Sequence, residues 1–231
     1  MDEFDQEPGK PDIDAISIDV GLPDAAARAR AANYGKKPMA EVAVELDDGT
    51  VYRIVVPVRV GRLLDDAAVA LPQSWHDAFD AIHELEYRVC VAQLTDLLSR
   101  RDYAEGELRR KLKTYGYRDQ EIERALEYGR DHRFVDDLRF AEYFIAERVR
   151  RGWGKRRVEL ELQRRGIDVD AIEGYPERFF NDEDDLARAC KILASRPVPT
   201  TRAHEKFIRH LVSRGFSYAI AREAASSVLS D

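Results

Sequence analysis

The 231-residue sequence predicts a mainly helical protein, with tandem three-helix repeat modules in an elongated, curved body, preceded by a β-hairpin and a disordered acidic tail. The repeats are predicted by a pattern that occurs three times at offsets of about 50 residues. In each copy, two apolar residues four apart are followed by glycine and a third apolar residue. An apolar alternation with period two, and an acidic, proline-containing start of the chain, predict the other two parts.

Residues 1–36 contain Pro8 and Pro11 among many acidic side chains and few bulky apolar ones. Lys and Arg number 9 against 19 Asp and Glu in residues 1–96, and 28 against 25 in residues 97–231, so the acidic charge is concentrated at the front. This composition buries too little apolar surface to fold, which predicts a disordered acidic tail. The tail either increases solubility or competes for a basic surface further along the chain.

Residues 37–78 are expected to form a β-hairpin and a connector. Alternating apolar residues flank Asp48-Gly49, a frequent hairpin turn. Pro57 has no backbone N–H, so the second strand should be short or lie at a sheet edge. An isolated hairpin is marginal in water, so we expect it to pack on the helices or pair with another segment. The alternating residues are Val42, Val44, Leu46, Ile54, Val56, Val58 and Val60.

The first helical repeat is expected over residues 79–131. It begins with a long helix that runs to about Ser99 at an apolar spacing of three and four residues. Asp102 and Glu105 have the spacing of a capping box for a second helix, and Gly116 ends that helix. A third helix completes the repeat.

The second repeat is expected over residues 132–180. The carboxylates of Asp136 and Asp137 suit the N-terminus of its first helix, and a third helix is expected to start near Asp168 and to end before Pro176. The third repeat, residues 181–231, begins with a run of acids and has Ser217 as the cap of its last helix.

The glycine of each repeat is expected to end the second helix of its module. If Gly166 adopts the left-handed conformation, Leu162 and Ile167 take the two positions that touch in a Schellman cap. The same spacing occurs at Gly116 and Gly215. The pattern therefore predicts three equivalent helix ends.

A basic stripe is the strongest candidate for a binding surface. Residues 148–165 contain 8 basic and 2 acidic side chains, too few acids to neutralise the stripe as in a purely structural helix. An ordinary solvated face is the alternative, and the ligand could be an acidic protein groove or phosphate. Trp153, between two glycines, is either an interface anchor or a filler between modules. The predicted partner-binding residues are Arg148, Arg150, Arg151, Trp153, Lys155, Arg156, Arg157, Arg164 and Arg165.

Composition and spacing argue against several other classes. Cys90 and Cys190 lie in apolar helical patterns, and the five histidines have no ligand or triad spacing, so we expect no catalytic residues, no metal and no cofactor. Gly154-Lys155 lacks the first glycine and the Ser or Thr of a phosphate-binding loop. No apolar run approaches ~20 residues, so we expect no membrane partner and a cytoplasmic location.

Two segments resemble the signature of the RecX family of recombination regulators. The first is Phe134-Val135-Asp136-Asp137 with Phe140-Ala141, and the second runs from Arg148 through Gly152-x-Gly154 to Gly166-Ile167. Glu107-Leu108 and the following Leu112 and Gly116 are also similar. The resemblance covers about residues 85–225. It departs from the family where Arg202 and Ala203 replace the Gly-x-Gly, and it does not reach residues 1–75.

The resemblance implies a non-enzymatic regulator that binds the RecA recombinase filament on single-stranded DNA. Members restrain the ATPase, strand-exchange and co-protease activities of that filament in recombination, repair and the SOS response. A direct DNA-binding helical module, on single-stranded or duplex DNA, is the first alternative, and an armadillo-like interaction adaptor is the second. We expect the free protein to be a monomer.

Overall fold

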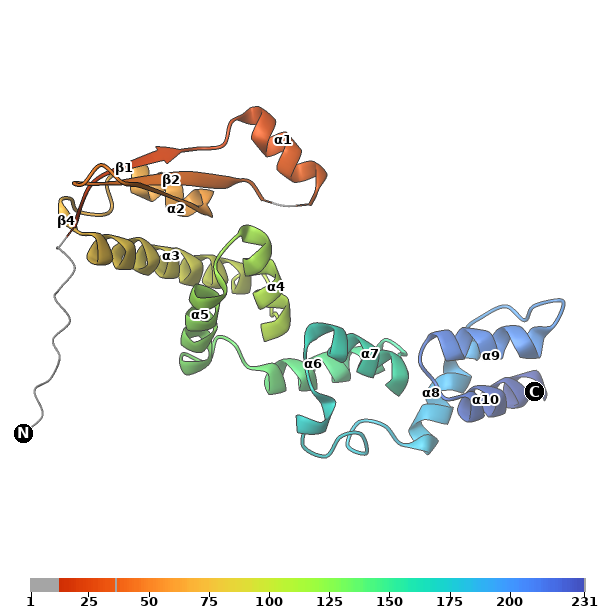
Figure 1. Ribbon diagram of the computed structural model, residues 1–231. Helices are drawn as coiled ribbons and strands as arrows, with labels where there is room; N and C mark the ends of the chain where they lie inside the picture. Colours follow the sequence, from red (N-terminus) through yellow and green to blue (C-terminus); the bar gives the residue numbers. More distant parts are fainter. Residues whose placement is uncertain (1–12, 36, 231) are drawn as a thin grey trace, which may run out of the picture. The chain divides into compact units, whose positions relative to one another are not determined.

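The computed structural model describes residues 13–35 and 37–230, which form two compact units. The N-terminal unit comprises the chain up to Arg101 together with Leu108–Phe134. The C-terminal unit comprises Asp102–Glu107 together with the chain from Val135 onward. Figure 1 shows the helices and strands with the labels used below.

An antiparallel sheet of four strands, in the order β3-β2-β1-β4, opens the N-terminal unit. Strands β2 and β3 form the predicted hairpin, in which Leu46 N donates to Thr50 O over 2.9 Å and Gly49 has a φ of 82°. β3 lies at the sheet edge, as Pro57 predicted. The strands are β1 (Asp14–Gly21), β2 (Met39–Leu46), β3 (Val51–Pro57) and β4 (Gln73–Ser74).

The prediction of a disordered tail is wrong for residues 13–35. β1 pairs with β2 from Ala15 opposite Leu46 to Gly21 opposite Glu41. Helix α1 (Ala25–Asn33) follows, capped by the Asp24 carboxylate, which accepts from Ala27 N over 2.7 Å. Pairing with a strand distant in sequence supplies hydrogen bonds that composition does not reveal. Residues 1–12 and 36, the rest of the predicted tail, lie outside the described residues.

The second strand of the hairpin ends earlier than predicted. Val58 and Val60 belong to helix α2 (Val58–Asp65), which begins directly after Pro57. Pro57 cannot donate to the ladder, and its φ of −53° suits the residue before a helix. Val60 and Leu64 are four residues apart and lie on the buried face of this helix.

Three helices complete the N-terminal unit: α3 (Trp75–Leu98), α4 (Glu105–Tyr115), whose first three residues belong to the other unit, and α5 (Asp119–Asp131). Ser74 Oγ caps α3 by accepting from Asp77 N over 3.1 Å. In Figure 1, α3 lies beside α5, and their apolar faces meet in one core. That core includes Ile82, Leu94, Ile122 and Leu126, none of them more than 1% exposed.

The C-terminal unit contains α6 (Asp137–Arg150), α7 (Lys155–Arg165), a 3₁₀ turn η1 (Val169–Ala171), α8 (Asp182–Ala194), α9 (Ala203–Ser213) and α10 (Tyr218–Ser230). One apolar cluster lies under α6 and α7, and a second lies among α8, α9 and α10. Ser217 Oγ accepts from Ile220 N over 3.2 Å and so caps α10, as predicted.

The third helix expected from Asp168 is wrong, because only the 3₁₀ turn forms there. The left-handed Gly174, with a φ of 73°, ends the segment before an α-helix could grow. Ile172 and Phe180 fill the core position of the missing helix, each less than 8% exposed.

The three predicted helix ends are confirmed. Ile167 N donates to Leu162 O over 3.1 Å and Gly166 N to Gln163 O over 2.9 Å, the two bonds of a Schellman cap. Gly166 has a φ of 87°, Gly116 of 93° and Gly215 of 95°. The equivalent bonds from Tyr117 to Leu112 and from Phe216 to Leu211 measure 3.3 and 3.2 Å. No helix in the described part of the chain is long and apolar enough to cross a membrane.

Candidate partner-binding surface

The turn Gly152-Trp153-Gly154, between α6 and α7, is fixed to the turn between α9 and α10. Gly154 N donates to Arg214 O over 2.8 Å, and Arg156 N donates to Gly215 O over 3.1 Å. In addition, the Arg214 guanidinium donates to the carbonyl oxygens of Arg151 and Gly152, both over 3.3 Å. The backbone that presents the predicted basic residues is therefore held by the neighbouring module.

The glycines at this junction are needed because two backbones touch. A Cβ on Gly154 would collide with the backbone of Gly215 and Phe216, and a Cβ on Gly215 would collide with Arg157 N. A similar contact occurs where the cap of α7 meets the start of α4, since a Cβ on Gly106 would collide with Arg165 O. At both places, the glycine-capped end of a second helix rests on the first turn of the preceding second helix.

The acidic pair Asp136-Asp137 caps two different helices. Asp136 Oδ1 accepts from Arg139 N over 2.9 Å and caps its own helix, α6, as predicted. Asp137 Oδ1 instead accepts from Glu105 N over 2.7 Å, at the start of α4. The predicted start of this helix at Asp102 is wrong, because α4 begins at Glu105 and takes its cap from the next module. The pair thus connects consecutive modules.

Two of the predicted partner-binding arginines are packed into the module. The Arg148 guanidinium lies 4.8 Å from the ring centroids of both Phe144 and Trp153, and its side chain is 22% exposed. The Arg165 guanidinium lies 4.8 Å from the Phe144 ring centroid, and it pairs with Glu161 over 2.6 Å. Both side chains stabilise the apolar cluster under α6 and α7.

Three further cations have carboxylate partners on the same helices. Arg151 pairs with Glu147, Arg164 with Glu161 over 3.2 Å, and Lys155 with Glu159 over 3.9 Å. The prediction that the stripe lacks acidic partners is therefore wrong for these residues, because glutamates three and four positions away lie on the same helix face. Such exposed pairs are worth little, so a partner can exchange them at small cost.

Arg150, Arg156 and Arg157 remain available at the surface. Among the described residues, Arg150 and Arg156 have no carboxylate within 4.0 Å, and both are exposed. The Arg157 guanidinium lies 3.9 Å from the Trp153 ring centroid and carries no ion pair. Trp153 is half-buried and meets Phe144 edge-on at 6.4 Å, so it packs within its own module. Its role as an interface anchor stays a prediction.

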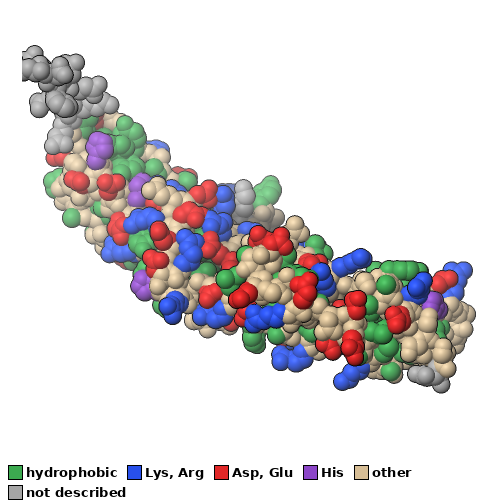
Figure 2. Space-filling view, turned by 90° about the horizontal axis from the view of Figure 1, so that it is seen from below, with side chains coloured by type: hydrophobic (Ala, Val, Ile, Leu, Met, Phe, Trp, Pro, Cys, Tyr) green, Lys and Arg blue, Asp and Glu red, His purple; other side chains and the backbone are tan. Residues whose placement is uncertain are grey.

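A cavity of about 630 Å³ opens beside Arg156 and carries charges of both signs. Asp185, in its wall, is 6% exposed, and burial raises the pKa of its carboxyl while the Arg188 partner opposes the shift. On the face displayed in Figure 2, basic and acidic side chains are interspersed. The cavity is lined by Lys155, Arg156, Glu159, Pro176, Glu177, Phe180, Asn181, Asp182, Asp185, Gly215, Ser217 and Ile220.

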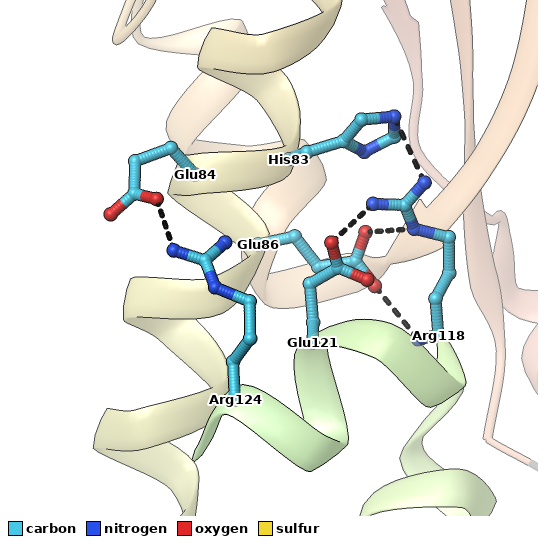
Figure 3. Close-up of polar contacts among 6 residues, drawn as sticks. All are labelled: His83, Glu84, Glu86, Arg118, Glu121 and Arg124. Carbon is cyan, nitrogen blue, oxygen red and sulfur yellow. Dashed lines mark hydrogen bonds and ion pairs between the residues drawn. The ribbon is translucent and has the colours of Figure 1, made fainter. Parts of the chain in front are cut away.

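A buried charge cluster in the N-terminal unit was missed by the sequence analysis (Figure 3). The carboxylates of Glu86 on α3 and Glu121 on α5, each 1% exposed, share the guanidinium of Arg118. Arg118 Nε donates to Glu86 over 3.1 Å, and its Nη2 donates to Glu121 over 2.5 Å. Glu86 follows Leu85 within an apolar helical stripe, and a charge at such a position was the available signal.

This cluster connects α3 to α5 through side-chain ion pairs, which is a structural role. Burial raises the pKa of Glu86, although bonds from Arg118 oppose the shift. Burial and the positive charge of Arg118 lower the pKa of His83, whose Nε2 lies 2.9 Å from Arg118 Nη1. The part of the chain that the structure describes contains no group of three or more His, Cys, Asp or Glu side chains that could hold a metal ion.

The fold and the surface define a tandem helical-module protein with an arginine-bearing junction. Models of the first and second three-helix domains of RecX match residues 92–128 and 136–174. The regulatory protein RecX of Vibrio vulnificus is 34% identical over 142 residues, which cover 59% of this chain and 91% of that protein. The chain belongs to the RecX family of regulatory proteins.

Other comparisons agree with this assignment. The regulatory protein RecX of Vibrio campbellii is 34% identical over 124 residues, or 53% of this chain and 80% of that protein. A crystal structure of RecX from Lactobacillus salivarius has a TM-score of 0.54 at 17% identity and covers 63% of this chain and 98% of its own. A second, of a regulatory protein RecX, has a TM-score of 0.57 at 20% identity, covering 80% and 94%. At these identities the two structures establish the shared fold alone.

Proposed function

We propose that this protein binds the RecA recombinase filament on single-stranded DNA and restrains its ATPase, strand-exchange and co-protease activities. Its membership of the RecX family and the recombinase-regulating role implied by its motifs support this proposal. The observation that carries it is the junction at residues 150–157, inside the second matched domain. There, exposed arginines project from a backbone held by the next module.

In this proposal the predicted basic residues fall into three groups, according to their contacts within the protein. Arg150, Arg156 and Arg157 contact the partner directly, because they are exposed and carry no ion pair. Arg148 and Arg165 act indirectly, since their stacking on aromatic rings positions the turn and α7. Arg151, Lys155 and Arg164 contribute by exchanging their intramolecular carboxylates for those of the partner.

A protein partner fits this surface better than bare DNA. Four carboxylates line the cavity beside Arg156, those of Glu159, Glu177, Asp182 and Asp185. They would repel a phosphate backbone but could pair with basic residues of a protein. Several modules on one chain can contact neighbouring filament subunits, and linked weak contacts gain from effective concentration. A monomer located in the cytoplasm with its recombinase partner is part of the proposal.

The decisive experiment compares two triple variants with equal charge change. Arg150→Glu/Arg156→Glu/Arg157→Glu is expected to raise the half-inhibitory concentration in recombinase ATPase and strand-exchange assays at least ~10-fold, because several charged contacts are lost. The matched control is Arg196→Glu/Arg209→Glu/Arg222→Glu, which reverses exposed arginines on the last module and should inhibit like the parent. Equal inhibition by both variants would show that the junction is not the binding surface.

Direct DNA binding is the second candidate, favoured by the three arginines without ion pairs. It predicts that affinity for bare single-stranded DNA falls with log salt at a slope of about −0.7 per neutralised phosphate. Binding to bare DNA that is as tight as binding to the filament, and lost in the junction variant, would favour this candidate. No effect on the filament at micromolar protein would leave a helical adaptor for another protein.

A further inference from the structure

The N-terminal unit contains an apolar groove bordered by arginines. It lies between α2 and α3 and has a volume of about 470 Å³. Apart from Ala92, it lies outside both segments matched by the family models. The groove is lined by Arg59, Arg62, Leu63, Leu85, Arg88, Val89 and Ala92.

The positive charge at this groove is not neutralised by nearby acids. Arg62 and Arg88 have no carboxylate within 4.0 Å among the described residues, and Arg59 Nη1 donates over 2.6 Å to a neutral acceptor, Gln93 Oε1. The apolar floor reaches the surface at Leu63, which is 40% exposed. An apolar strip bordered by guanidinium groups without carboxylate partners suits a ligand that is both apolar and acidic.

The groove favours a peptide over a nucleic acid. Its lining has no aromatic ring on which a base could stack, and its floor is aliphatic. A suitable ligand has one bulky apolar side chain for the floor and carboxylates on either side for the arginines. An acidic peptide with a central aromatic residue has this pattern.

We propose that the groove binds the N-terminal segment of the same chain, residues 1–12. This segment has the sequence MDEFDQEPGKPD, in which Phe4 lies among Asp2, Glu3, Asp5 and Glu7. Phe4 would lie on the aliphatic floor, and the acids around it would pair with the arginines at its borders. A cis contact also covers the exposed apolar strip without a second protein.

The chain length permits this contact. Ile13 O accepts from Trp75 N over 2.9 Å, which fixes the start of the described chain at the first residue of α3. Leu85 and Val89 lie about 15–21 Å further along that helix at 1.5 Å per residue. Phe4 precedes Ile13 by nine residues, which extend to about 30 Å, so the segment reaches the groove with slack.

The proposed contact makes residues 1–12 an intramolecular ligand of the groove. Any acidic, aromatic-containing segment of another protein must displace a tethered competitor whose effective concentration is on the order of millimolar. The groove is then a second interaction surface, separate in sequence from the arginine junction and independent of whether that junction binds a recombinase.

The test uses the full chain with a photoreactive p-benzoylphenylalanine in place of Phe4. Irradiation is expected to yield intramolecular crosslinks to the helix segments that carry Leu63, Leu85, Val89 and Ala92, as mapped by mass spectrometry. Arg62→Glu/Arg88→Glu should reduce the yield at least ~5-fold, because the charge complementarity is reversed. Arg30→Glu/Arg53→Glu, which changes exposed arginines elsewhere in the unit, should leave it unchanged.

A second measurement leaves the groove residues unchanged, so it does not depend on the folding of a groove variant. A fluorescent peptide with the sequence of residues 1–12 should bind the full-length variant Phe4→Ala/Glu3→Lys/Asp5→Lys at least ~10-fold more tightly than the parent chain, whose groove is occupied. Crosslinks to other segments, crosslinked dimers, or equal peptide binding by parent and variant would overturn the proposal.

Discussion

The two units hold their packed arginines with different partners. In the N-terminal unit, one guanidinium, that of Arg118, serves two carboxylates that are each 1% exposed. In the C-terminal unit, Arg148 and Arg165 are 22% and 20% exposed and lie against aromatic rings. Loss of the arginine leaves buried anions in the first arrangement. In the second it leaves an uncovered ring and carboxylates that are 16–23% exposed and can be hydrated. The same residue type should therefore differ in its importance for stability.

The largest effect is expected for Arg118→Met. Removal of the guanidinium leaves two buried carboxylates without their cation, which should cost roughly 3–5 kcal/mol of unfolding free energy. Denaturant unfolding measures this loss. The matched control is Arg124→Met, whose exposed pair with Glu84 over 2.7 Å should contribute less than about 1 kcal/mol. Equal losses for the two variants would remove the distinction between buried and exposed pairs.

Leu162→Ala tests the apolar cluster on which the C-terminal arginines rest. Leu162 is fully buried and supplies the carbonyl of the Schellman cap. Truncation should cost about 2–5 kcal/mol, from lost burial and the cavity that remains. Thermal melting shows the change, and an unshifted curve would contradict the modular core.

The N-terminal cluster should also make stability depend on pH. The pKa of Glu86 is raised above its ordinary value of 4.5, so the folded state binds this proton more tightly than the unfolded state. Its contribution to stability is therefore lost as pH rises from 4.5 through the raised pKa. We expect the parent to lose more stability than Glu86→Gln over this range, measured by denaturant unfolding at each pH.

The pKa of His83 is shifted in the opposite direction, so this residue serves as the comparison for that experiment. Its pKa is lowered from 6.5, so its contribution to stability is present above pH 6.5 and is lost as pH falls through the lowered value. His83→Gln should therefore flatten the acid side of the profile. Identical pH profiles for parent, Glu86→Gln and His83→Gln would show that the cluster does not titrate with folding.

The smallest effect is expected for Arg148→Gln. Loss of the contacts with Phe144 and Trp153 should cost about 0.5–2 kcal/mol, because no buried anion remains behind. Arg150→Gln, on the same helix but exposed, should change stability by less than about 0.5 kcal/mol. A loss for Arg148→Gln as large as that for Arg118→Met would end the contrast between the two units.

Local features of this protein could be predicted because their chemistry is local. The cap at Gly166 involves six consecutive residues, and the hairpin turn at Asp48-Gly49 involves even fewer. Asp136 caps its own helix for the same reason. In each case the hydrogen-bonding partners are neighbours in the chain, so spacing and residue type suffice.

Features that depend on distant partners could not be predicted. β1 was missed because its partner, β2, lies beyond a helix, and Asp137 was assigned to the wrong helix because its donor, Glu105, belongs to an earlier segment. Arg148 and Arg156 look alike in sequence, yet one is stacked on aromatic rings and the other is exposed.

The sequence by itself determined the helical modules, their glycine ends and the family, since apolar spacing and backbone conformation act over a few residues. Only the tertiary structure decided which arginines are available to a partner. A charged side chain is less available to a partner when the fold places a carboxylate or an aromatic ring beside it. For Arg165 these neighbours include Glu107, on a different helix. The spacing of charges along one helix does not reveal neighbours that belong to other helices.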